Sequence, residues 1–195
     1  MYERNNVIRQ FEKTIAGHCN APYAVAVESC SAALFLCCLY LKVTEVTIPK
    51  RTYFSVPFGI KHAGGRVKFE DREWSGAYRL KPYPIIDSAV RFRRNMYVPG
   101  LFHCLSFHYS KHIPIGRGGM MLTDNRKAAE WFRKMRNDGR REIPKELDRV
   151  RLSGWNFYMT PEQAARGLSL FFWRIHGKKD LPDIDMGYED LSYVC

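Results

Sequence analysis

Apolar residues recur along the chain with two different periods. Val7, Phe11 and Ile15 are spaced by four, the spacing of one helix face, and predict a helix over residues 7–16. Tyr23-Ala-Val-Ala-Val27 is instead a continuous apolar run, which is typical of a buried strand. The same reasoning predicts strands at 43–48, 66–70, near Ile85, at 101–107 and at 120–123, and helices from Ser31, after Thr52, at 126–136 and at 161–174.

This alternation of strands and helices predicts an α/β fold, built as a three-layer sandwich with a mainly parallel central sheet. We expect one domain over residues 1–177. Residues 178–195 form a polar, Asp-rich tail that we expect to pack as an irregular arm or across a dimer. Between residues 72 and 84 we expect only a short link.

The composition is that of a globular chain, because 195 residues with 46% hydrophobic content can bury a core without metals or disulfides. No apolar run approaches the ~18 residues of a membrane span. The first residues also lack the apolar core of a signal peptide, so we expect an intracellular, cytoplasmic protein. The cysteines show no Cys-x-x-Cys spacing and are expected to be reduced core thiols; they are Cys19, Cys30, Cys37, Cys38, Cys104 and Cys195. We expect no metal site, and His103, His108 and His112 have spacings unsuited to one.

The charge changes the range of partners to consider. Lys and Arg number 31 against 20 acidic residues, which gives a net charge of +11. The positive residues gather at 91–94, along 126–141, and at Arg149 and Arg151. A surface of this kind attracts polyanions, so a nucleic acid is one possible partner. Solvated helix faces with no partner are the alternative.

Candidate chemistry centres on one lysine. Ser106-Phe-His-Tyr-Ser-Lys111 reads as the end of a strand, and Gly116-Arg-Gly-Gly119 follows it. A serine hydroxyl and backbone amides suit a phosphate group, while a nearby amine suits an aldehyde, so this pattern favours pyridoxal phosphate. A solvated surface lysine is the alternative from these residues alone.

Two further segments support the same chemistry. Asp87 ends a short apolar strand, where an open α/β sheet presents its functional groups, and its carboxylate can pair with a pyridinium nitrogen. Upstream, a strand ending at Glu28 runs through Ser29-Cys-Ser31 into a helix. Because the first amides of a helix have no intrahelical acceptor, this turn can hold a phosphate.

The order of these motifs resembles that of the DegT/StrS-type sugar aminotransferases, which are pyridoxal phosphate enzymes of fold type I. The resemblance covers about residues 9 to 170. The segments that carry it are Ser29-Cys-Ser-Ala-Ala-Leu34, Pro49-Lys-Arg-Thr-Tyr53, Asp87-Ser-Ala89, Ser106-Phe107 to Lys111, Gly116-Arg-Gly-Gly119, Gly154-Trp-Asn-Phe-Tyr-Met159 and Gln163-Ala-Ala165.

The resemblance implies a role for each matched residue of the catalytic centre. Lys111 is expected to hold pyridoxal 5'-phosphate as an internal aldimine and to shuttle the substrate α-proton. Asp87 is expected to keep the ring nitrogen protonated, so that the ring accepts electrons. Tyr53 is expected to stack on the ring, and an ordinary core aromatic is the alternative for it.

Phosphate binding is implied for a second group. Cys30, Ser31 and Ser106 are expected to bind the cofactor phosphate within one subunit. In this family the residue at Asn156 reaches the phosphate of a neighbouring subunit, which implies a homodimer with shared active sites. A turn or capping residue is the alternative for Asn156.

The chain departs from the family pattern at three positions and in size. Cys30 replaces a glycine, Arg117 replaces an acidic residue, and Val90 stands where a Gln or His is frequent. Full-length members are roughly twice as long, so the chain resembles a minimal form that lacks a strand–helix unit before Ile85 and the C-terminal small domain.

Three functions follow from these observations. The first is an enzyme, an aminotransferase that moves nitrogen from a small amino donor such as glutamate to a sugar- or nucleotide-linked ketone. The second is a decarboxylase or other lyase that acts on an amino-acid-type adduct of a nucleobase in DNA, as in phage-type hypermodification, which would fit a phage-encoded protein. The third is an inactive relic of the family.

Overall fold

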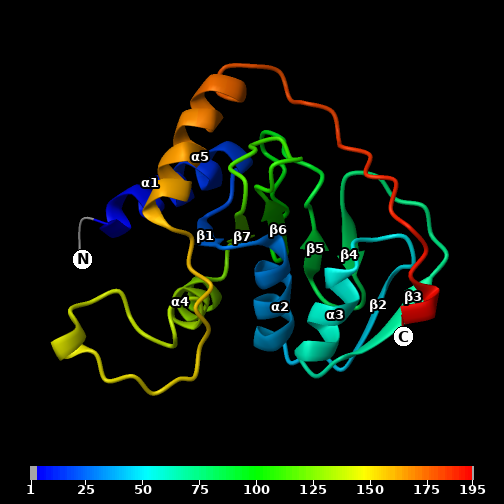
Figure 1. Ribbon diagram of the computed structural model, residues 1–195, viewed down its shortest axis with the longest axis horizontal. Coiled ribbons are helices and arrows are strands. Elements are labelled where there is room, and N and C mark those ends of the chain that lie inside the picture. The colour runs from blue at the N-terminus through cyan, green and yellow to red at the C-terminus, as the bar shows by residue number, and fades with distance from the viewer. Residues whose placement is uncertain (1–3, 195) are drawn as a thin grey trace.

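A computed structural model describes residues 4–194, and seven strands of this range form its centre (Figure 1). One sheet has five strands in the order β1-β7-β6-β5-β4, and a second pairs β2 with β3. The backbone bridge between Thr47 and Lys81 joins the second sheet to the end of β4. The strands are β1 (Tyr23–Val27), β2 (Glu45–Pro49), β3 (Arg66–Glu70), β4 (Tyr78–Leu80), β5 (Ile85–Asp87), β6 (Phe102–Ser106) and β7 (Gly119–Thr123).

The sheet is mixed rather than mainly parallel in its pairings. β5 pairs in parallel with β6, and β2 with β3, whereas β1–β7, β6–β7 and β4–β5 are antiparallel. The reason is the length and content of the connections. Four residues join β4 to β5, and the segment 107–118 joins β6 to β7 without a helix. At both connections the chain therefore returns antiparallel beside the strand it has just left.

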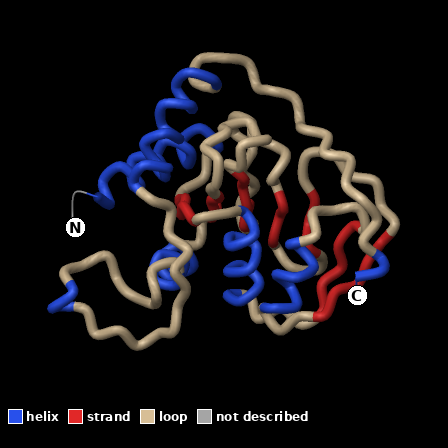
Figure 2. Tube along the Cα trace, viewed as in Figure 1, coloured by secondary structure: helices blue, strands red, loops and turns tan. Residues whose placement is uncertain are grey.

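Helices cover both faces of the sheet and confirm the predicted α/β layers. α2 (Cys30–Tyr40), α3 (Ser55–His62) and α4 (Arg126–Met135) share one core, while α1 (Arg4–Cys19) and α5 (Pro161–Arg174) share the other (Figure 2). Successive residues of a strand point to opposite faces. Val25 and Val27 therefore pack toward α2, and Ala24 and Ala26 pack toward α1.

The predicted element positions hold closely, with one exception. The strand at 66–70 and the helix at 161–174 have the bounds that the sequence predicts, and the remaining predicted elements lie within a few residues of their expected positions. The exception is β4, which lies inside the segment expected to be only a link. It is three residues long and is defined by its pairing with β5.

The segment after α5 crosses its own fold as an irregular arm (Figures 1 and 2). The backbone amide of Ile184 donates to the carbonyl of Val90, and that of Leu191 donates to the carbonyl of Lys50. The arm therefore passes the connection between β5 and β6 and ends beside β2. Cys195 lies outside the described residues, and no helix in 4–194 has the length and apolar character to cross a bilayer.

Two of the expected surface arginines pack inward instead, Arg136 buried and Arg133 partly buried, which corrects one part of the charge prediction. Arg133 on α4 and Arg136 just after it form ion pairs with Glu12 of α1, at 3.5 and 2.5 Å. Arg136 is 3% exposed and also donates to Glu142. A buried carboxylate needs such partners, so these charges hold α1 against α4 and do not contribute to a polyanion surface.

Candidate active site

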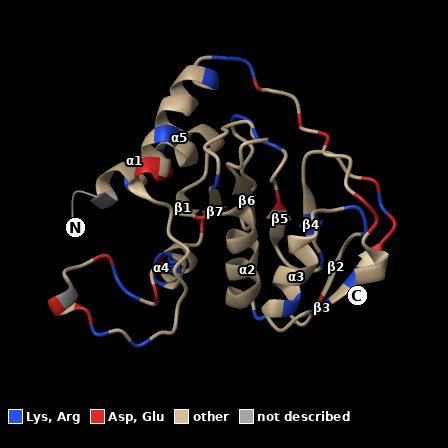
Figure 3. Ribbon diagram, in the orientation of Figure 1, with Lys and Arg blue, Asp and Glu red and all other residues tan. Residues whose placement is uncertain are grey.

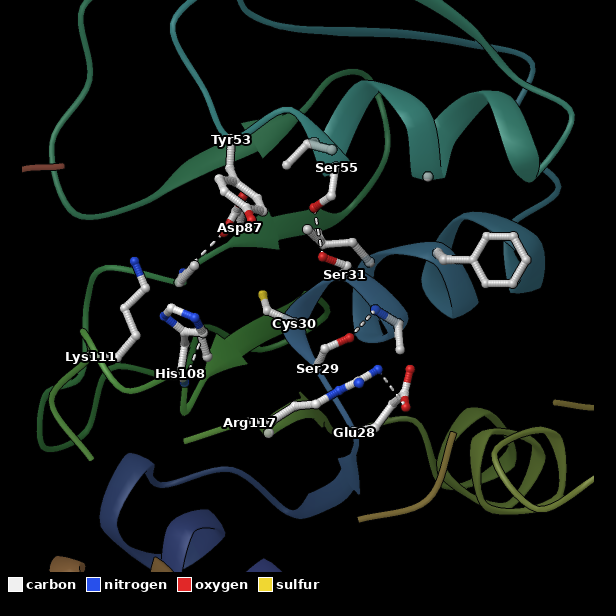
Figure 4. A pocket seen from close by; sticks show the side chains of 18 of the residues that line it. Glu28, Ser29, Cys30, Ser31, Tyr53, Ser55, Asp87, His108, Lys111 and Arg117 are labelled. Carbon is white, nitrogen blue, oxygen red and sulfur yellow. Dashed lines mark hydrogen bonds and ion pairs between the residues drawn. The ribbon is translucent and has the colours of Figure 1, made fainter. Parts of the chain in front are cut away.

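A pocket of about 1250 Å³ opens where β5 and β6 end and α2 begins (Figure 4). Six of the seven residues predicted for the site line it; they are Cys30, Ser31, Tyr53, Asp87, Ser106 and Lys111. Asn156 does not line it and is exposed, although its neighbours Trp155 and Phe157 do. The six residues come from four segments that are far apart in the chain, at 30–31, 53, 87 and 106–111.

The N-terminus of α2 forms an anion-binding end of this pocket. Ser29 caps the helix, because its hydroxyl accepts from the Ala32 amide at 3.1 Å and its carbonyl accepts from the Ala33 amide at 3.1 Å. The Cys30 and Ser31 amides have no acceptor inside the helix and lie in the pocket wall. Free amides at the positive end of a helix dipole favour a phosphate.

A glycine makes this turn possible. A Cβ on Gly119 would lie 2.2 Å from the carbonyl carbon of Ser29 and 2.4 Å from the Cys30 nitrogen. The start of β7 therefore packs directly against the turn before α2. The hydroxyl oxygen of Ser31 is also 2.6 Å from that of Ser55, which fixes the side of the turn nearest α3.

The Asp87 carboxylate is held in one orientation. Asp87 is 5% exposed. One carboxylate oxygen accepts from the Tyr78 hydroxyl at 2.9 Å, and the other accepts from the Ala89 amide at 3.0 Å. The Thr52 and Tyr78 hydroxyl oxygens are 2.5 Å apart. Burial raises the pKa of Asp87, and the two hydrogen bonds and Lys111 oppose that rise. A positive group beside this carboxylate would favour its ionised form.

Lys111 lies in a turn after β6. Its backbone amide donates to the His108 carbonyl at 2.9 Å. The residue is 9% exposed. Burial lowers the pKa of Lys111, while Asp87 and the Cys30 thiol oppose that change. A larger fraction of the amine is then neutral near pH 7, which is the form that attacks a carbonyl carbon.

Aromatic side chains form the wall on the side of the C-terminal arm. Trp74 and Tyr188 are stacked, with ring centroids 5.9 Å apart and an interplanar angle of 18°. Tyr53 is 47% exposed and lies 6.3 Å from Tyr188 between ring centroids. These rings offer flat apolar faces to a planar ligand.

Sequence reasoning missed several residues of this site. Tyr78, Trp74 and Tyr188 come from the supposed link and from the tail, and His108 was considered only as a metal ligand. The one available signal was the presence of lone aromatics in otherwise polar segments. Two of the three positions that depart from the family pattern are also at the site. Arg117 pairs with Glu28 at 2.8 Å at the pocket rim, and Cys30 lines the pocket, where burial keeps the pKa of its thiol well above the ordinary value.

An α/β sandwich with a buried lysine, a buried aspartate and a helix N-terminus around one pocket defines the class of fold type I pyridoxal phosphate proteins. The chain belongs to the DegT/DnrJ/EryC1/StrS aminotransferase family, whose sequence model matches residues 2–83 and 98–171. The unmatched segment 84–97 contains Asp87.

Three relatives illustrate the similarity. The spore coat polysaccharide biosynthesis protein SpsC of Bacillus subtilis is 25% identical over 236 residues, with 95% of this chain and 59% of that protein covered. PseC of Helicobacter pylori, an aminotransferase of pseudoaminic acid biosynthesis, superposes with a TM-score of 0.73 at 15% identity, over 86% of this chain and 57% of PseC. NtdA of Bacillus subtilis, solved with bound cofactor PMP, has a TM-score of 0.66 at 19% identity, over 83% and 47%. The chain thus spans about three fifths or less of the length of these relatives.

The residues present fit the cofactor of the family, pyridoxal phosphate. The Lys111 amine suits its aldehyde, the Asp87 carboxylate suits its ring nitrogen, and the α2 amides suit its phosphate. The close approach at Gly119 fixes the backbone of the turn that carries these amides.

Proposed function

We propose that this chain is a pyridoxal phosphate-dependent aminotransferase that acts on a sugar- or nucleotide-linked ketone with a small amino acid as nitrogen donor. The observation that carries this proposal is that Lys111 and Asp87 line one pocket with the N-terminus of α2. When bound, the cofactor supplies an aldehyde that carries an amino group and a ring that accepts electrons.

Each side chain then has a defined task. Lys111 would attach the cofactor through its Nζ and would afterwards move a proton at the substrate carbon, because it lies buried and partly neutral beside the reacting groups. Asp87, held by Tyr78 and Ala89, would pair with the ring nitrogen. The Cys30 and Ser31 amides and the Ser31 and Ser106 hydroxyls would bind the phosphate, and Tyr53 would cover the ring.

A homodimer with shared active sites is part of the proposal. Phe54 and Phe58 of the α3 region are 52% and 39% exposed and lie 6.4 Å apart between ring centroids, and a partner subunit would cover this apolar pair. Asn156 does not line its own pocket and is exposed, as a residue that serves a neighbouring subunit would be.

A second candidate is a lyase that acts on a modified nucleobase in DNA. The stacked pair Trp74 and Tyr188 favours it, because such rings suit a planar base, and the net charge of +11 favours a polyanionic substrate. Both candidates use Lys111 and Asp87 in the same way, so the substrate alone distinguishes them.

An absorbance spectrum tests the proposal. The purified chain is mixed with pyridoxal phosphate, freed of unbound cofactor and then treated with L-glutamate. We expect a retained visible band that disappears with glutamate and returns with a keto-sugar nucleotide. A chain that retains no cofactor would refute both candidates, and a band that responds to an amino-acid-modified oligonucleotide but not to glutamate would favour the lyase.

A further inference from the structure

A row of side chains crosses the sheet on the side away from the proposed active site. Arg79 of β4 is paired with Ile86 of β5, and Ile86 is paired with His103 of β6. Their chain neighbours Tyr78, Asp87 and Cys104 point to the opposite side, toward α2 or the pocket. Because side chains alternate along a strand, the row belongs to the α1 side of the sheet.

Neither helix of that side reaches this part of the sheet. The core shared by α1 and α5 includes residues of β1, β6 and β7, and among the described residues it includes none of β4 or β5. The row is covered instead by the connection 88–101 and by the C-terminal arm. The result is a cavity of about 470 Å³, which we call the arginine groove.

The arginine groove carries an excess of positive charge. Its arginines are Arg72, Arg79, Arg91, Arg93 and Arg94, and Asp180 is the one acidic residue among its described lining. Arg91 and Arg93 share a single carboxylate, that of Asp183, at 2.7 and 3.0 Å. In Figure 3, Lys and Arg positions mark the connection between β5 and β6, and acidic positions mark the C-terminal arm.

Two guanidiniums in the groove are free of acidic partners. Arg79 donates to the carbonyls of Tyr83 and Pro82, both at 2.7 Å, and forms no ion pair with a described residue. Arg94 is exposed, and within the described range only its backbone amide bonds an acid, the Asp180 carboxylate at 3.0 Å. Their charge is therefore available to a bound anion.

A buried histidine gives a second, independent indication of a ligand. His103 is 5% exposed, and its Nδ1 lies 3.2 Å from the Ser88 hydroxyl. Its Nε2 is buried without a hydrogen-bond partner among the described residues. Burial and the nearby Arg91 lower the pKa of His103 to about 4, so the ring is neutral at pH 7. A buried polar atom without a partner in a cavity wall can be satisfied by a bound molecule, and His103 lines the same groove as the arginines.

We propose that the arginine groove is a second binding site that takes the phosphate groups of a nucleotide. Guanidinium groups match phosphate oxygens with paired hydrogen bonds, which explains why the positive lining is arginine without lysine. A cavity of about 470 Å³ suits a nucleotide-sized ligand. Residues 84–97, which supply six of the 14 lining residues and three of the five arginines, lie outside the family match, so the groove is not a shared feature of that match.

The phosphate can come from a free nucleotide or from a nucleic-acid strand, and two probes distinguish these sources. One is thymidine diphosphate, measured by calorimetry. The other is a fluorescent single-stranded oligonucleotide, measured by anisotropy over a series of salt concentrations. For a strand, the slope of log affinity against log salt is about 0.7 per phosphate neutralised.

The variants are Arg94→Glu and Arg79→Gln, with Arg66→Glu as matched control. Arg66 is an exposed arginine of β3 that lies outside the groove, and its ion pair with Glu45 is long, at 3.8 Å. We expect each groove variant to weaken binding about tenfold or more, because a charge-assisted contact is lost, and the control to change it about twofold or less. Thermal unfolding verifies that all variants are folded.

The binding measurements test the proposed site and identify the source of the bound phosphate. Selective loss for thymidine diphosphate assigns a free nucleotide, and selective loss for the oligonucleotide assigns a strand. The proposal is overturned if wild type binds neither probe at low salt, or if Arg66→Glu weakens binding as much as Arg94→Glu. Binding that survives both groove substitutions belongs to another anion site, such as the N-terminus of α2, and also overturns it.

Discussion

The Tyr78 hydroxyl donates a hydrogen bond of 2.9 Å to the carboxylate of Asp87. Tyr78 belongs to β4 and Asp87 ends β5, and the two residues face each other directly in the antiparallel register. The short strand before β5 therefore does more than connect elements. It supplies the donor that orients a buried acid at the base of the pocket.

Removing that donor is expected to shift the pH profile of the enzyme. Tyr78→Phe raises the pKa of Asp87 further above its ordinary value, because burial is then less opposed. A carboxyl with a higher pKa ionises only at higher pH, so the acid limb of glutamate turnover should move upward by about one to two pH units. Tyr83→Phe, which loses only a contact with Thr44, is the control. An unmoved acid limb in Tyr78→Phe would refute the orienting role.

Lys111→Ala is expected to abolish covalent cofactor attachment. The wild-type chain mixed with pyridoxal phosphate and borohydride should gain one stable adduct by mass spectrometry, at a peptide containing Lys111. The control Lys127→Ala removes an exposed lysine of α4 and should label like wild type. Equal labelling of the Lys111→Ala protein at its pocket would show that the assignment is wrong.

Subunit mixing tests the shared site. Lys111→Ala and Asn156→Ala proteins are each expected to be nearly inactive, and their mixture should regain up to about a quarter of wild-type turnover after subunits exchange, since random pairing makes half of the dimers mixed and each has one intact site of two. Sedimentation measures the oligomeric state in parallel. A monomer with full activity would exclude the shared site.

Gly119→Ala is expected to destabilise the fold and weaken phosphate binding together. The added Cβ would overlap the backbone of Ser29 and Cys30, and neither group is the flexible end of a side chain. We expect a loss of a few kcal/mol, in the range of overpacked core sites. The matched control is Gly17→Ala within α1, where nothing lies within 4 Å and alanine should stabilise by about 0.5–1 kcal/mol. Thermal melts with and without cofactor measure both effects, and equal melts for the two variants would contradict the close approach.

Glu12 is expected to make stability sensitive to acid. Burial opposes its ionisation, but the guanidiniums of Arg136, Arg133 and Arg9 and the Ala26 amide outweigh that effect and hold the pKa of Glu12 below its ordinary value. The contribution of Glu12 to the free energy of unfolding is therefore complete above the pKa that this residue has in the unfolded chain. It is lost as the pH falls through the lower pKa of the folded state.

Glu12→Gln should cost about 3 kcal/mol at pH 7, because buried Arg136 loses one of its two carboxylate partners and keeps only Glu142. Its stability should also fall less steeply than that of wild type below about pH 4.5. Glu130→Gln, which removes an exposed pair with Arg126, is the control and should change little. Denaturant unfolding at several pH values measures all three proteins. Parallel curves for wild type and Glu12→Gln would show that the carboxylate is not the sensitive group.

The sequence predicts best the elements that begin or end at residues with a local capping role. α5 begins at Pro161 because Thr160 and Gln163 form a reciprocal capping box, and those residues are readable directly. β4 could not be predicted, because three residues have no usable period and its identity comes from pairing with β5 and from the bridge of Lys81 to Thr47.

The same distinction applies to the site. Asp87 and Ser106 end neighbouring parallel strands, so their meeting at one edge follows from the strand pattern. Tyr188 reaches the pocket because the arm crosses the fold, and Arg136 is buried because Glu12 lies opposite it. These contacts depend on tertiary packing between distant segments, about which local patterns contain no information.

Strand β5 separates two cavities, and neighbouring residues of the strand border different ones. Asp87 borders the pocket that contains Lys111, and Ile86, its immediate neighbour, borders the arginine groove. Substitutions on the groove side can change what binds there without touching a side chain of the catalytic pocket, so selection can act on the two surfaces separately. Position 86 is therefore also a practical place for an engineer to attach a spectroscopic probe that senses one cavity and leaves the chemistry of the other intact.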